Sequence, residues 1–90
     1  MRSLTLSAKA YQSYEELRKN NPAAHRNLQK IIKEMLRGNP AKGFGKPEPL
    51  KHNLSGYWSR RISKSDRVIY KFTDAELFVI AIGGHYEQFS

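Results

Sequence analysis

The chain contains no cysteine, and this absence removes several kinds of chemistry. Disulfides, thiolate catalysis and cysteine-ligated zinc sites are excluded, and the absence fits a reducing compartment. No apolar run reaches the length of about 18 residues that a membrane-spanning helix needs. The N-terminal stretch MRSLTLSAKAYQ has no apolar segment long enough for a signal peptide. We therefore expect a cytoplasmic protein without a membrane partner.

Acidic residues are also scarce. Eight Asp and Glu stand against 16 Lys and Arg, which gives a formal net charge of +8 and a pI of about 10.0. This excess suits a polyanionic partner, which can be a nucleic acid, an anionic membrane surface or an acidic protein. Ninety residues suffice for one modest core, so we expect a single domain over residues 1–90.

Familiar signatures of metal and phosphate chemistry are missing too. No cluster of His, Asp and Glu has metal-ligand spacing, and the chain has neither a P-loop nor a nucleophile elbow. We therefore predict neither a metal ion nor a cofactor. His25, within a helical pattern, is expected to face solvent.

The first half of the chain predicts one strand and two helices. RSLTL, residues 2–6, alternates polar and apolar side chains as a short strand does. Ser7 can cap a first helix, and Asn21 with Pro22 can begin a second. The second helix has one apolar face, at spacings i, i+3, i+4, i+7 and i+8, made by Leu28, Ile31, Ile32, Met35 and Leu36.

The second half predicts a loop and three strands. Residues 38–50, GNPAKGFGKPEPL, contain too much glycine and proline for a helix or a central strand. Strand-like runs follow at residues 57–62, 67–72 and 77–82, separated by polar turns. The order β-α-α-β-β-β predicts an α+β fold, an antiparallel sheet with an N-terminal helical hairpin on one face. The first strand should join the sheet beside a later one.

Positive charge concentrates in the loop and the strands that follow it. Only two acids, Glu48 and Asp66, interrupt a run of eight basic residues. The eight are Lys42, Lys46, Lys51, Arg60, Arg61, Lys64, Arg67 and Lys71. Alternation along residues 67–72 places Arg67 and Lys71 on the side away from the helices. We therefore predict that the open face of the sheet is a binding surface.

RNA can be cut without a metal ion by its own 2′-hydroxyl. A base removes the hydroxyl proton, a cation stabilises the phosphorane, and an acid protonates the leaving 5′-oxygen. Glu48 is a candidate base, Arg67 a forked phosphate ligand, and His85 an acid with a free pKa of about 6.5. Tyr86 can stack on a base or donate a hydrogen bond. Taken singly, each residue can equally be an ordinary surface residue.

The stretch GKPEPLKHNLSGYWSRRI, residues 45–62, resembles the YoeB/Txe type of toxin in the RelE/ParE superfamily, as do the following DRVIY and the later HY. The resemblance implies a RelE-like fold of the microbial-ribonuclease type. It implies a toxin of a type II toxin–antitoxin system, an mRNA interferase that cleaves messenger in the ribosomal A site and inhibits translation. Its implied partners are mRNA, the 30S ribosome and a cognate acidic antitoxin, and such toxins sometimes form homodimers.

The resemblance also implies roles for individual residues. Glu48 matches the general base, Arg67 the arginine on the scissile phosphate, His85 the general acid and Tyr86 the neighbour that orients substrate. Lys51 and Arg61 match basic residues of the family that lie around the phosphate. The predicted RNA-binding set also includes Lys46, Arg60 and Lys71. The chain departs from the family pattern where EQFS follows the His-Tyr pair, and where Gly83, Leu6 and Leu17 replace an arginine and two tryptophans that relatives often carry.

Two other functions stay open. A ParE-like gyrase inhibitor has the same fold. Glu48, His85 and Tyr86 argue against this function, because the resemblance implies no such set of residues in ParE-like toxins. A non-catalytic module that binds RNA or ribosomes would explain the charge through phosphate contacts alone. DNA supercoiling and messenger cleavage assays separate the three.

Overall fold

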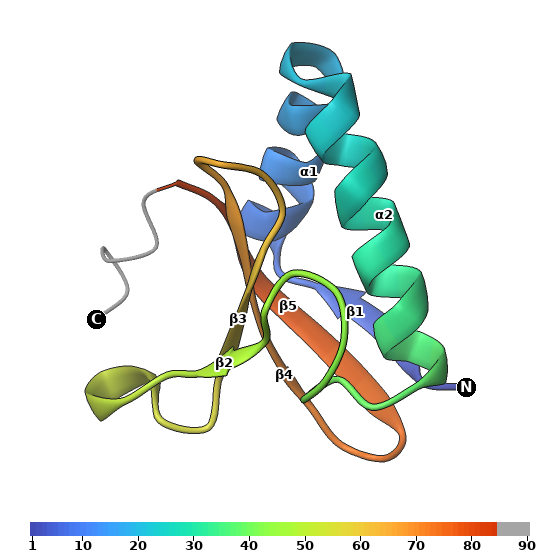
Figure 1. Cartoon of the computed structure of the whole chain (residues 1–90), viewed down its shortest axis with the longest axis vertical. Helices are drawn as coiled ribbons and strands as arrows, with labels where there is room; N and C mark the ends of the chain where they lie inside the picture. The colour runs from blue at the N-terminus through green and yellow to red at the C-terminus, as the bar shows by residue number, and fades with distance from the viewer. Residues whose placement is uncertain (85–90) are drawn as a thin grey trace.

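The computed structural model describes residues 1–84 and shows one sheet with two helices against one of its faces (Figure 1). His85 and Tyr86 lie outside the described residues. The elements are β1 (Ser3–Leu6), α1 (Ala8–Asn20), α2 (Pro22–Arg37), β2 (Glu48–Pro49), a 3₁₀ turn η1 (His52–Leu54), β3 (Trp58–Arg61), β4 (Arg67–Phe72) and β5 (Glu76–Gly83). The α+β class and the helical hairpin are confirmed.

The sheet has five strands in the order β1-β5-β4-β3-β2. The pairs among β2, β3, β4 and β5 are antiparallel, as predicted, whereas β1 pairs with β5 in parallel. The predicted loop contributes the extra strand β2, whose Glu48 and Pro49 pair with Ser59 and Trp58. Pro49 is tolerated because β2 is an edge strand, where a missing N–H breaks no ladder.

Both helices begin as their capping residues predict. Ser7 Oγ accepts a hydrogen bond from the Ala10 amide at 3.0 Å, and Asn21 Oδ1 accepts one from the Ala24 amide at 3.2 Å. Pro22 takes the first position of α2, where no hydrogen-bonding N–H is needed. Within residues 1–84, neither helix combines the length and apolar character that crossing a membrane requires.

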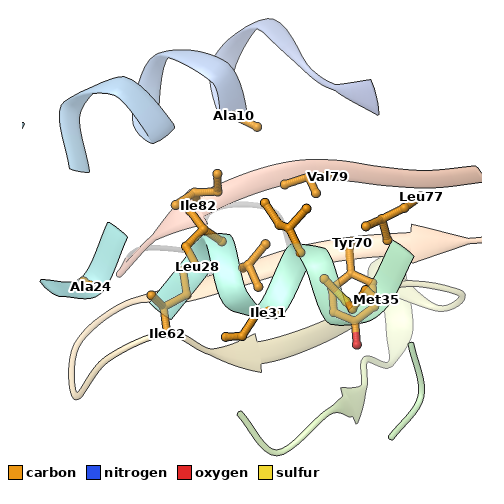
Figure 2. Packing of buried hydrophobic residues seen from close by; sticks show 12 residues of the cluster. Ala10, Ala24, Leu28, Ile31, Met35, Ile62, Tyr70, Leu77, Val79 and Ile82 are labelled. Carbon is orange, nitrogen blue, oxygen red and sulfur yellow. The ribbon is translucent and has the colours of Figure 1, made fainter. Parts of the chain in front are cut away.

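The core lies between α2, α1 and the sheet (Figure 2). Its fully buried side chains include Leu28, Ile31 and Met35 from α2, which meet Tyr70 and Leu77 of the sheet. Val68 also belongs to this cluster and Phe72 packs against it, so the face predicted for alternate residues of β4 is confirmed. The opposite face of the sheet carries polar and basic side chains together with Ile69 and Ala81, which are also buried.

The expectation that His25 faces solvent is wrong. Its side chain is buried, and its ring packs edge-on to Tyr14 with 4.5 Å between the centroids. His25 precedes Leu28 by three residues and Ile32 by seven, so it falls on the buried face of α2. Among the described residues, its Nε2 atom has no hydrogen-bond partner.

Candidate active site

The face of the sheet opposite the helices carries a row of side chains that begins at Glu48. Glu48 of β2 pairs with Ser59 of β3, Ser59 pairs with Ile69 of β4, and Ile69 pairs with Ala81 of β5. Residues directly opposite each other in antiparallel strands project from the same face. The Glu48 side chain is exposed, and it makes no ion pair with another residue of the described chain. A carboxylate held this way is open to accept a proton from a ligand.

Arg61, Arg67 and Gly83 form the next row on this face. Arg67 donates from Nη1 to Ser59 Oγ at 3.3 Å, so its side chain leans toward the row that contains Glu48. Arg61 lies directly opposite Arg67, and like charges at opposed positions destabilise a strand pair. Two arginines set beside each other in this way suit an anion that lies between them.

A bulge in β5 determines which of its side chains reach this face. The pairing shifts between Ile69 and Tyr70, whose partners are Ala81 and Val79, so Ile80 is the extra residue. Val79 packs in the core, whereas Ala81 and Gly83 lie on the open face, so the bulge separates residues that strict alternation would place together. Bulges are common beside active sites because they re-aim side chains. His85 and Tyr86 follow this strand in sequence, outside the described residues.

Four of the predicted RNA-binding residues have exposed side chains. Lys46 and Arg61 line one shallow pocket together with Phe44 and Gly45. Lys71 lies on the open face of β4 with Nζ 5.3 Å from the ring centre of Tyr57 and 5.5 Å from that of Phe78. The fourth, Lys51, immediately precedes η1. Arg61 and Lys71, together with Arg67, place positive charge on the open face of the sheet.

The prediction that Arg60 binds RNA is corrected by its position. Its side chain is completely buried and points to the helical side of the sheet. The guanidinium donates to Glu34 Oε1 at 2.8 Å, to the Phe44, Pro40 and Lys42 carbonyls at 2.9, 3.0 and 2.6 Å, and to the Tyr70 hydroxyl at 3.2 Å. The sequence held a signal for this. Arg60 is two residues from both Trp58 and Ile62, so the three share one face of the strand, and Trp58 and Ile62 face the core.

The surroundings of Arg60 perturb two other groups. The hydrogen bond from Arg60 holds the pKa of the Glu34 carboxyl below its usual range. Burial raises the pKa of the Tyr70 hydroxyl, which donates to the Pro40 carbonyl at 2.6 Å. Sequence reasoning missed this network. It therefore missed that the buried Arg60 side chain holds the loop of residues 39–44 through hydrogen bonds to its carbonyls. The fixed loop leads directly to Glu48.

Gly45 completes the connection between the loop and the strands. Its carbonyl accepts a hydrogen bond from the Arg61 amide at 2.7 Å, and its φ is +86°. A Cβ at this position would lie 2.6 Å from the Arg61 carbonyl oxygen, closer than any side chain tolerates. Only glycine lets the loop approach β3 this closely three residues before Glu48.

Comparison with known proteins identifies the family. The model for "YoeB-like toxin of bacterial type II toxin-antitoxin system" matches residues 6–86 of this chain. The chain belongs to the YoeB-like toxin family. Toxin YoeB from Escherichia coli O6:H1 is 41% identical over 83 residues, which cover 92% of this chain and 98% of that protein.

Solved structures agree with this family. A YoeB dimer from Staphylococcus aureus superposes with a TM-score of 0.84 at 34% identity, covering 94% of this chain and 98% of its own. A YoeB–YefM complex from the same organism gives a TM-score of 0.85 at 32% identity, covering 96% and 99%. The expected family and the RelE-like fold are therefore confirmed for this YoeB-like toxin of a type II toxin–antitoxin system.

Among residues 1–84, no three His, Cys, Asp or Glu side chains lie together as a metal site would require.

Proposed function

We propose that this YoeB-like toxin is a ribosome-dependent endoribonuclease that cleaves messenger RNA in the ribosomal A site and so stops translation. The observation that carries the proposal is the opposed pair Arg61 and Arg67, set one row from the exposed carboxylate of Glu48 on an open sheet face. Paired guanidinium groups suit a phosphodiester, and a neighbouring carboxylate suits proton removal. A gyrase inhibitor or a simple RNA-binding module has no need for that carboxylate.

In the proposed reaction Glu48 accepts the proton of the 2′-hydroxyl, whose oxygen attacks the adjacent phosphorus. Arg67, with Arg61 and Lys51 nearby, stabilises the negative charge that develops on the phosphorane oxygens. His85 protonates the 5′-oxygen as its bond to phosphorus breaks, and Tyr86 orients the nucleotide. The products are a 2′,3′-cyclic phosphate and a 5′-hydroxyl end, and no metal ion takes part. Lys46 and Lys71 hold the flanking backbone through their charge.

We also propose that the 90-residue chain acts in the cytoplasm as a single toxin domain, held inactive by a cognate antitoxin. Support comes from the Staphylococcus aureus relatives, one solved in complex with YefM and one as a dimer. The antitoxin should present an acidic segment that folds onto the basic sheet face. Such a complex should weaken as salt rises, because salt screens exposed charges. We also propose that the toxin forms a homodimer, because the Staphylococcus aureus relative was solved as one.

Growth arrest in expressing cells tests the catalytic assignment. Glu48→Gln, Arg67→Ala and His85→Ala should each relieve the arrest, while Lys19→Gln on the exposed side of α1 should not. Primer extension on messenger from the same cells should show cuts for the parent and the control only. Unchanged toxicity and cleavage in all three site variants would defeat the proposal, and inhibited supercoiling by purified gyrase would favour the gyrase inhibitor.

A further inference from the structure

The open face of the sheet carries two aromatic rings that the proposed reaction does not use. Lys71 of β4 pairs with Phe78 of β5, so their side chains project from the same face. Lys71 Nζ lies 5.3 Å from the ring centre of Tyr57 and 5.5 Å from that of Phe78. Both rings are only partly buried, so each keeps some of its surface in solvent. We call Tyr57, Lys71 and Phe78 the aromatic row.

The aromatic row and the two opposed arginines lie on either side of the row that begins at Glu48. Arg67 and Lys71 are four residues apart on β4, which separates their rows by about 13 Å along the strand. Ile69 stands halfway between them and belongs to the row of Glu48 through Ser59. Three rows therefore follow one another along the strands: first the aromatic rings, then the carboxylate, then the arginines.

The order of the three rows gives a bound strand its direction. In the proposed reaction the 2′-hydroxyl that Glu48 deprotonates belongs to the nucleotide on the 5′ side of the scissile phosphate, and the arginines hold that phosphate. The carboxylate therefore lies on the 5′ side of the arginines, and the aromatic row lies further in the same direction. A messenger strand that runs along the three rows brings a base on the 5′ side of the cut to Tyr57 and Phe78.

We propose that the aromatic row binds a messenger base on the 5′ side of the scissile linkage by stacking, while Lys71 pairs with a phosphate beside that base. The inference rests on the proposed function, because it takes messenger as the bound strand. Aromatic side chains on a sheet face are a common platform for single-stranded RNA, and stacking accepts any base. Among residues 1–84 no carboxylate forms an ion pair with Lys71, so its charge is left for a ligand.

Removing the base from messenger and the rings from the protein tests the inference. Messengers with one abasic nucleotide, placed in turn at each A-site codon position on the 5′ side of the cut, are cleaved on programmed ribosomes. The leucine pair, Tyr57→Leu with Phe78→Leu, keeps apolar bulk without rings, and the conservative pair, Tyr57→Phe with Phe78→Tyr, keeps the rings. The control is Tyr11→Leu, because Tyr11 is 58% exposed on α1, on the other side of the sheet (Figure 1). Thermal unfolding verifies folding, and binding to the purified antitoxin is measured in parallel.

One abasic position should slow cleavage by the wild type about tenfold, and the leucine pair should slow cleavage of the intact messenger by a similar factor. The leucine pair should then cleave both messengers at equal rates, whereas the conservative pair and the control should behave as the wild type does. Losses that add, or no loss at any position, would overturn the stacking proposal alone. Wild-type cleavage by the leucine pair with weakened antitoxin binding would overturn it in favour of an antitoxin segment at this row. An intact messenger on wild-type toxin with programmed ribosomes would overturn the proposed function together with this inference.

Discussion

Arg60 donates from Nη1 to Glu34 Oε1 at 2.8 Å, and this ion pair joins β3 to α2 through a completely buried guanidinium. The same guanidinium satisfies the carbonyls of Pro40, Lys42 and Phe44. It therefore holds the loop that leads to Glu48 against the inside of the sheet. Lysine lacks the five donors in a fixed plane that this arrangement uses.

Replacing Arg60 with methionine should strongly destabilise the fold. The change removes the Arg60 donor from the Lys42 and Phe44 carbonyls, while the Pro40 carbonyl keeps the Tyr70 hydroxyl and Glu34 keeps the Phe44 amide. Each buried polar group left without a partner costs about 1–3 kcal/mol. Arg61→Met is the matched control, because the neighbouring side chain is exposed and its loss should change stability by less than about 0.5 kcal/mol. Urea unfolding of both variants measures the difference. Equal midpoints would show that the network around Arg60 does not stabilise the protein.

Acidification should weaken the fold through Glu34. The hydrogen bond from Arg60 lowers the pKa of this carboxyl below its ordinary value of 4.5, so the unfolded chain binds the proton more tightly than the folded one. The resulting stability is present above about pH 4.5 and is lost as the pH falls through the folded pKa. The Glu34 side chain is 41% exposed, so solvent screening limits the effect to about 1 kcal/mol.

The variant Glu34→Gln lacks this titration and serves as the comparison. Wild type should exceed it in urea midpoint at pH 7, and the difference should shrink at pH 3.5. Unfolding curves at both pH values check this. A difference that stays constant would mean that Glu34 titrates alike in the folded and unfolded chains.

Gly45→Ala should disturb the candidate site more than Gly56→Ala does. Both glycines have positive φ, +86° and +95°, so both substitutions add backbone strain of about 1 kcal/mol or more. Only at Gly45 would the new Cβ also meet a backbone atom, the Arg61 carbonyl oxygen at 2.6 Å, whereas nothing lies within 4 Å at Gly56. Thermal unfolding and messenger cleavage by both variants test this. Equal losses would remove the role given to the close approach of Gly45.

Local patterns in the sequence predicted much of this fold. Ser7, Asn21 and Pro22 start the helices because capping depends on neighbouring residues alone. The faces of β4 follow from strict alternation, and Arg67 and Lys71 accordingly reach the open side of the sheet. The position of Arg60 follows the same rule, although the clustering of charge suggested a surface role.

Features that depend on distant contacts could not be predicted in this way. The short strand β2 exists because Glu48 and Pro49 pair with β3, and its local sequence favours a loop. The parallel pairing of β1 with β5 depends on how the helical hairpin crosses the sheet. The bulge at Ile80 likewise arises from pairing with a strand further back in the chain. The burial of His25, by contrast, follows from its helical spacing to Leu28 and Ile32, a signal that the sequence held.

The central claim is that Glu48 and Arg67 act together on one phosphodiester of ribosome-bound messenger. Purified protein is incubated with a defined messenger, with and without programmed ribosomes, and the cut sites and rates are mapped at single-nucleotide resolution. We expect cuts within the A-site codon only when ribosomes are present, a rate about 10²–10⁴ lower for Glu48→Gln, and a rate at least about 10² lower for Arg67→Ala. Wild-type cleavage rates in both variants, or an intact messenger on wild-type toxin with programmed ribosomes, would contradict the claim.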